Sequence, residues 1–153
     1  MPVLLVVEDN AILAATLKGF LHDQDGLTVA AVVPSAEEAL EEIGNLVVDH
    51  GLDLVLVDVA LPSINGIDLV KILHKRYPAL PCIILSGHSG INYVERALAA
   101  GARGYIIKDN PPDILTAVER VLAGEIYLSE DLQRKLTPDL ATPTDPDAQS
   151  GQS

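Results

Sequence analysis

The sequence predicts a single α/β domain in which a parallel sheet lies between two layers of helices. Two observations lead to this class: five short apolar runs rich in Val and Ile, and five amphipathic stretches that alternate with them along the chain. Short apolar runs of this kind are typical of strands that are buried on both faces. Strands that alternate with helices imply right-handed parallel crossovers, so we expect a three-layer sandwich.

Each expected strand is followed by one expected helix. The strands are residues 3–7 (VLLVV), 28–33 (TVAAVV), 54–57 (LVLV), 82–85 (CIIL) and 104–107 (GYII). The stretches between them repeat apolar residues three or four positions apart, which gives a helix one apolar face. The helical stretches are residues 11–23, 36–47, 66–77, 91–102 and 112–124.

Residues that favour helix ends agree with these boundaries. Polar side chains with an acceptor oxygen are favoured just before a helix, proline in its first turn and glycine just after its end. The residues in question are Asn10 and Ser35 before the first two helices, Asn110 and Pro111 at the fifth, and Gly101 and Gly124 after the fourth and fifth.

We expect the folded domain to cover residues 1–128 and residues 129–153 to form a flexible acidic tail or a truncated linker. From Thr137 onward the sequence TPDLATPTDPDAQSGQS has one Leu, no aromatic residue, three Pro and three Asp. A segment of this composition cannot bury enough apolar surface to offset the entropy of ordering it.

Charge and composition exclude several classes of function. With 22 acidic against 10 basic residues the formal net charge is −12, so direct binding of this chain to nucleic acid phosphates is disfavoured. The single cysteine, Cys82, lies in an apolar run, which suits a core thiol in a reducing compartment. No apolar run approaches the roughly 20 residues that span a bilayer, and the N-terminus lacks the basic region of a secretory signal. We therefore expect a cytoplasmic protein without membrane contact.

The residues that carry chemistry come directly after the expected strands. The first strand leads into Glu8 and Asp9, the third into Asp58, the fourth into Ser86 and the fifth into Lys108. The carboxyl ends of parallel strands share one edge of the sheet, and ligands bind there. We therefore expect these five side chains to meet at one edge. The third strand would deliver Asp58 to a surface pocket without burying it.

Three carboxylates at one edge repel one another, which raises their pKa unless a cation is present. Mg²⁺ prefers oxygen ligands and takes one or two carboxylates together with water and phosphate oxygens. We expect Asp9 and Asp58 as direct ligands and Glu8 as a water-mediated ligand. Lys108 would pair with a phosphoryl oxygen or with Asp58, and Ser86 would donate a hydrogen bond to a second oxygen. Asp58, nearest the middle of the edge, could act as a nucleophile and form an acyl phosphate.

The chain resembles the receiver domain of bacterial two-component response regulators over residues 3 to about 125. The resemblance is carried by four segments, VVEDN, LVLVDVALPSINGIDL, IILSGHS and ARGYIIKDNPPDIL. It implies a flavodoxin-like (βα)5 fold with a five-stranded parallel sheet of order 2-1-3-4-5. It also implies that Asp58 is the phosphoacceptor, Glu8 and Asp9 the acidic pair, Ser86 the switch hydroxyl and Lys108 the family's lysine.

Further roles follow from the resemblance alone. The phosphoryl group would come from a histidine kinase or a histidine phosphotransferase, with Mg²⁺ bound also by the backbone carbonyl of Ala60. Ser86 would then move toward the phosphoryl group and Tyr105, the aromatic switch residue, would swing into the vacated space. The surface formed by the fourth helix, fifth strand and fifth helix would change, and a homodimer on phosphorylation is implied as one outcome.

The chain departs from the family pattern at three positions. Ala60 is small, His88 is bulky and titratable, and Asp109 follows the lysine where many receivers have proline. The segment KDNPPDIL, with AGEIYLSEDL after the last helix, is similar to regulators of the NarL type, which carry a C-terminal DNA-binding domain. We therefore expect a stand-alone receiver or the N-terminal fragment of a DNA-binding transcription regulator.

Two other classes stay open at this point. One is a phosphatase or phosphotransferase with an Asp nucleophile, although Ala60 occupies the position where such enzymes carry a second acid. The other is a flavin or nucleotide module, although the first strand-helix turn, VEDNAIL, has two acids and no glycine and so would repel a phosphate. We expect a signalling domain with at most slow loss of its own phosphoryl group.

Overall fold

The structure, a computed structural model, describes residues 2–22, 26–49, 51–87, 91–108, 111–129 and 132–133. Parallel strands form one sheet in the order β2-β1-β3-β4-β5-β6. The expected flavodoxin-like order 2-1-3-4-5 is therefore confirmed, and the structure adds a sixth strand beside β5. Among the described residues no helix is both long enough and apolar enough to cross a membrane.

The observed elements lie close to the expected ones. The strands are β1 (Val3–Val7), β2 (Thr28–Val33), β3 (Leu54–Asp58), β4 (Cys82–Ser86), β5 (Gly104–Ile107) and β6 (Tyr127–Leu128). The helices are α1 (Ala11–Leu21), α2 (Ala36–Asp49), α3 (Gly66–Arg76), α4 (Ile91–Ala100) and α5 (Pro111–Leu122).

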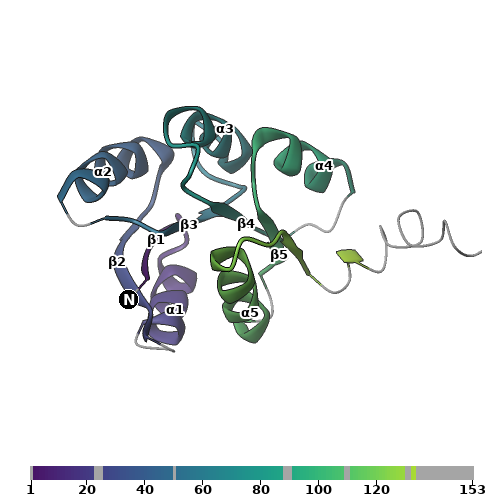
Figure 1. Ribbon diagram of the computed structural model, residues 1–153, viewed down its shortest axis with the longest axis horizontal. Helices are drawn as coiled ribbons and strands as arrows, with labels where there is room; N and C mark the ends of the chain where they lie inside the picture. The colour runs from purple at the N-terminus through teal and green to yellow at the C-terminus, as the bar shows by residue number, and fades with distance from the viewer. Residues whose placement is uncertain are drawn as a thin grey trace, which may run out of the picture.

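Helices cover both faces of the sheet. Figure 1 shows α2, α3 and α4 on one face and α1 and α5 on the other. Successive residues of β3 alternate between the two resulting cores: Val55 and Val57 lie in the core under α2, α3 and α4, and Leu54 and Leu56 in the core under α1 and α5. All of β3 is buried, which is why its sequence is a continuous apolar run rather than an alternating one.

Most of the expected helix-end residues act as predicted. The side chain of Asn10 accepts hydrogen bonds from two backbone amides of the first turn of α1, each at 3.0 Å. The hydroxyl of Ser35 accepts one from an amide of α2 at 3.2 Å. Gly101 and Gly124 have φ of 114° and 96° just after α4 and α5, a conformation that terminates helices and favours glycine. Asn110 lies outside the described residues.

The chain continues to pack on the domain after α5. Strand β6 pairs with β5, and the Tyr127 hydroxyl donates a hydrogen bond to Asp113 Oδ1 of α5 at 2.6 Å. Of the expected tail, the structure describes Ser129, Leu132 and Gln133. Ser129 is 4% exposed and Leu132 is fully buried, and the Gln133 side chain donates a hydrogen bond to the carbonyl of Leu128 at 2.6 Å. The described part of this segment therefore belongs to the packed structure.

Candidate functional site

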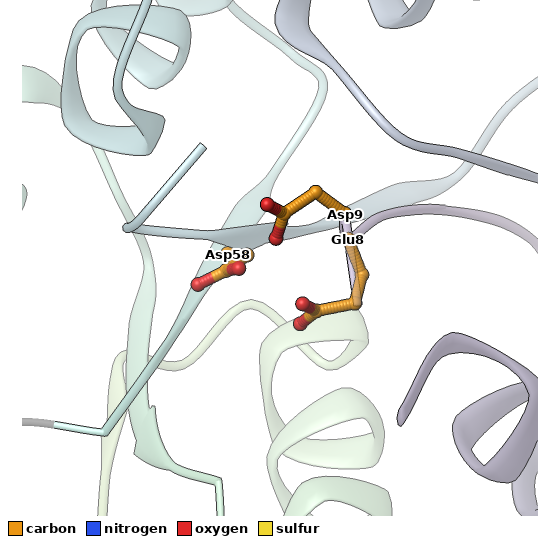
Figure 2. A group of neighbouring side chains, drawn as sticks. All are labelled: Glu8, Asp9 and Asp58. Carbon is orange, nitrogen blue, oxygen red and sulfur yellow. The ribbon is translucent and has the colours of Figure 1, made fainter. Parts of the chain in front are cut away.

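Three carboxylates meet at the carboxyl edge of the sheet, as the sequence predicts. Glu8 and Asp9 directly follow β1, Asp58 ends β3, and these two strands are hydrogen-bonded neighbours. One carboxylate oxygen from each of the three residues lies within 4.8 Å of the others. Figure 2 shows the three carboxyl groups converging on one region above the strand ends.

The three carboxylates differ in their exposure to solvent. Asp9 is exposed, whereas Glu8 and Asp58 are each 2% exposed. The expectation that Asp58 would not be buried is therefore wrong. The segment after β3 folds back over its end: a Cβ added at Gly66 would collide with the carbonyl oxygen of Asp58 and lie 2.8 Å from the Cα of Val59. Only glycine allows this close approach of the chain to the backbone at the end of β3.

Lys108 lies between the two buried carboxylates. Its Nζ is 2.9 Å from Asp58 Oδ1 and 3.0 Å from Glu8 Oε1. Asp58 Oδ1 also accepts a hydrogen bond from the backbone amide of Ala60 at 3.0 Å. Burying a carboxylate is costly unless it is paired and hydrogen-bonded, and these contacts supply the pairing. With Asp9 included, three acidic groups share one ammonium, so the site carries excess negative charge.

The pKa of Glu8 reflects this environment. The pKa of Glu8 is raised to about 7, mainly by burial and also by the neighbouring Asp58, although Lys108 and the amide of Asn10 lower it. For Lys108, burial lowers the pKa, but hydrogen bonds to Asp58 and Glu8 and their charges outweigh it, so the pKa lies above its ordinary value. Burial is thus the main cause of the raised pKa of Glu8, the charge of Asp58 adds the smallest contribution, and Lys108 stays charged.

The donor set fits a magnesium ion. The cluster offers carboxylate oxygens only, and hard divalent cations prefer such ligands. Glu8 Oε1 is buried and accepts no hydrogen bond of good geometry from the described residues, although Lys108 Nζ lies 3.0 Å away. The excess of negative charge around this oxygen would be relieved by a bound cation.

Ser86 and Tyr105 form a second pair next to the acidic cluster. Ser86 ends β4 and Tyr105 lies in β5, and both side chains are fully buried. Burial raises the pKa of Tyr105, a hydrogen bond with the side chain of Ser86 lowers it, and the charge on Tyr93 raises it, with a net rise. The two expected switch residues are therefore in contact, and Ser86 lies at the strand end nearest the carboxylates.

A cavity of about 310 Å³ adjoins Glu8 and Asp9. Its other walls are the small side chains of the first two turns of α1, together with Lys18 and the end of β2. Asp9, the exposed member of the acidic pair, can therefore be approached along α1. His88 and Asp109, which the sequence singled out as departures from the family pattern, lie outside the described residues.

Sequence reasoning missed one polar residue close to this site. Ser129 is hydrogen-bonded to β5, the strand that leads to Lys108, yet it was expected to begin a tail. A signal was present in the apolar residues of EIYLS after α5, but two strand residues are too few to give a clear period.

The fold and the acidic edge define a flavodoxin-like domain whose carboxylate cluster could hold a cation. Comparison with known proteins identifies the family. A family model described as the response regulator receiver domain matches residues 4–119. The chain belongs to this family, and the resemblance noted in the sequence is confirmed. Receiver domains of transcriptional regulators are signalling domains and not classical enzymes.

Curated relatives include transcriptional regulators from several bacteria. The transcriptional activator protein ExaE of Pseudomonas putida is 35% identical over 135 residues, which is 87% of this chain and 61% of that protein. The transcriptional regulatory protein UhpA of Salmonella typhimurium is 33% identical over 132 residues, 86% of this chain and 64% of that protein. The chain thus spans less than two thirds of the length of these relatives.

Solved structures agree with this assignment. A two-component response regulator of the LuxR family from Aurantimonas sp. SI85-9A1 has a TM-score of 0.81 at 26% identity, over 91% of this chain and 97% of that chain. A LuxR family DNA-binding response regulator from Silicibacter pomeroyi has a TM-score of 0.72 at 30% identity, over 86% and 99% of the two chains.

Proposed function

We propose that this receiver domain accepts a phosphoryl group on Asp58 in a reaction that requires Mg²⁺. The observation that carries the proposal is the convergence of Glu8, Asp9 and Asp58 around the ammonium of Lys108. The donor is a histidine kinase or a histidine phosphotransferase, as for the family. A carboxylate oxygen of Asp58 attacks phosphorus and forms a P–O bond. The P–N bond of the phosphohistidine breaks, and the departing imidazole keeps the electron pair and takes up a proton.

The residues around Asp58 have distinct roles in this proposal. Asp9 and Asp58 would bind Mg²⁺ directly, together with the backbone carbonyl of Ala60, and Glu8 would bind it through water. When bound, the ion would neutralise the charge of the phosphoryl oxygens. Asp58 Oδ1 already accepts a hydrogen bond from the amide of Ala60 and forms the ion pair with Lys108. We therefore assign Oδ2 as the attacking oxygen. Lys108 then pairs with a phosphoryl oxygen, which lowers the repulsion between the anionic donor and the carboxylates.

The switch that reads the phosphoryl group is the Ser86 and Tyr105 pair. When Ser86 donates a hydrogen bond to the phosphoryl group, it gives up its bond with Tyr105. The change would spread to the surface of α4, β5 and α5, the surface that we expect to control an output and to form a homodimer. A phosphoryl group can drive this only if it binds one arrangement more tightly than the other.

We further propose that the receiver domain extends at least to Gln133, five residues beyond the expected boundary at residue 128. The full burial of Leu132 supports this extent. Regulation of transcription is the output favoured by the relatives, since both ExaE and UhpA are named as transcriptional proteins. In that case DNA binding would reside outside the receiver domain, because the acidic receiver repels nucleic acid.

A small phosphodonor tests the central step without a kinase. Incubation with acetyl phosphate and Mg²⁺ should add one phosphoryl group, measured by intact mass, and a chelator should prevent it. Asp58→Asn should remove the labelling. The matched control is Asp68→Asn, which changes an exposed carboxylate at the start of α3 and should leave labelling intact. Persistent labelling of Asp58→Asn would refute the assignment.

A further inference from the structure

Ser129 ties the segment after β6 to the end of β5. Its backbone amide donates a hydrogen bond to the carbonyl of Tyr105 at 3.0 Å. Its hydroxyl oxygen accepts one from the amide of Ile107 at 2.8 Å. The residue is 4% exposed, so these bonds form away from bulk water, where a missing partner is not replaced by solvent.

The hydroxyl of Ser129 accepts the hydrogen bond that a backbone carbonyl would accept in a regular parallel ladder. The paired residues of β6 end at Leu128, and the carbonyl of Ser129 instead accepts the amide of Gln133 at 2.9 Å. The chain has thus turned away from the sheet, and the hydroxyl continues the ladder to Ile107. Threonine could replace this acceptor, whereas alanine would leave the amide of Ile107 without it.

Ile107 directly precedes Lys108, the only basic residue of the acidic cluster among the described residues. On the other side of the strand, the amide of Lys108 donates a hydrogen bond to the carbonyl of Ser86 at 2.9 Å. Ile107 is therefore hydrogen-bonded to Ser129 on one side of the strand, and Lys108 is hydrogen-bonded to β4 on the other side. From this doubly held position, Lys108 Nζ contacts Asp58 at 2.9 Å and Glu8 at 3.0 Å.

We propose that Ser129 is a positioning residue for Lys108: by fixing the outer side of β5, it sets the position of the ammonium beside Asp58. The segment after α5 thereby affects phosphoryl transfer without touching the reacting groups. The proposal rests on the proposed function of Asp58 and Lys108. Because coupling between two sites is reciprocal, a phosphoryl group that engages Lys108 would also change how firmly Ser129 is held.

The test compares rates of labelling by acetyl phosphate and Mg²⁺, measured by intact mass against time. Small misplacements of a catalytic group lower rates by up to about 100-fold, so Ser129→Ala should be roughly 3- to 30-fold slower than wild type. Ser129→Thr should label within about twofold of wild type, because it keeps the acceptor. Gln133→Ala, which removes the bond to the Leu128 carbonyl and keeps the hydroxyl, is the matched control and should also stay within about twofold.

A double variant separates positioning from general loosening of the fold. If Ser129 acts through Lys108, then Ser129→Ala should add less than about a twofold loss in a Lys108→Ala background. An equal loss in both backgrounds would overturn the proposal, as would a wild-type rate in folded Ser129→Ala. If Ser129→Ala does not fold at the assay temperature, Ser129→Cys, with a weaker acceptor of similar size, serves in the same comparisons.

Failure of the underlying function would look different. In that case the wild-type protein would not be labelled, or Asp58→Asn would be labelled as well. A labelled wild type with an unlabelled Asp58→Asn, together with an unaffected Ser129→Ala, would leave the phosphoacceptor in place and refute only the role of Ser129.

Discussion

Without a bound cation, the free energy of unfolding should fall as pH rises from about 5 to about 8 because of Glu8. Its pKa is raised from 4.5 to about 7, mainly by burial, and only 2% of the residue is exposed. Between these two values the folded state holds a proton that the unfolded state has released. The stabilisation is complete below pH 4.5 and is lost as pH rises through 7. At about 1.4 kcal/mol per pKa unit, the loss is about 3 kcal/mol.

The assay is urea unfolding with a chelator present, at several pH values between 5 and 8. Far-ultraviolet circular dichroism is the suitable signal, since the chain has no tryptophan. Glu8→Gln keeps the shape of the side chain and cannot titrate. The free energy of unfolding of this variant should therefore not show the fall with pH that is due to Glu8. Glu41→Gln, which alters an exposed residue of α2, should follow the wild type at every pH.

The comparison between wild type and Glu8→Gln decides the outcome. We expect their difference in free energy of unfolding to change by about 3 kcal/mol across the range. A constant difference would show that the carboxyl of Glu8 is not held in its protonated form by burial. It would also remove one of the reasons for assigning a cation to this site.

Three further changes test other parts of the structure. Gly66→Ala should lower the free energy of unfolding by about 1–3 kcal/mol, because the added Cβ would collide with the backbone at the end of β3. Leu132→Ala should lower it by about 2–4 kcal/mol, since the side chain is fully buried. Cys82 should resist alkylation at pH 8 until the protein unfolds, because burial raises the pKa of its thiol to about 12.

Each of these changes has a control or an opposing outcome. Gly19→Ala adds a Cβ where nothing lies within 4 Å and should stabilise α1 by up to about 1 kcal/mol. Ile126→Ala alters a residue that is 63% exposed and should change stability by less than about 0.5 kcal/mol. If Leu132→Ala behaved like Ile126→Ala, the segment after β6 would not be part of the folded domain. Rapid alkylation of Cys82 in the native protein would contradict its burial.

The sequence predicted the sheet well because the strands are buried on both faces. The expected run at residues 54–57 and the observed β3 (Leu54–Asp58) differ by one residue, since continuous apolar runs have sharp ends. Strand β6 escaped prediction because it has only two half-buried residues. It forms because β5 offers a free edge, which is a property of the folded sheet and not of the local sequence.

The site was predictable for a topological reason, and its electrostatics were not. Strand ends in a parallel sheet share one edge, so Glu8, Asp9 and Asp58 had to lie near one another. Spacing along the chain does not say how deeply a carboxylate is covered or which oxygen an ammonium contacts. The burial of Asp58 is a property of the folded edge of the sheet, and the ion pairs depend on the side-chain conformation of Lys108.

The short strand β6 also covers the outer edge of β5. Tyr127 of β6 and Ser129, which directly follows β6, occupy the outer carbonyls of Arg103 and Tyr105 and the outer amide of Ile107. An uncovered strand edge is a template on which a strand from another copy can add. A version of the protein shortened to end before Tyr127 would therefore be prone to aggregate through the same strand that presents the ammonium to the phosphorylation site.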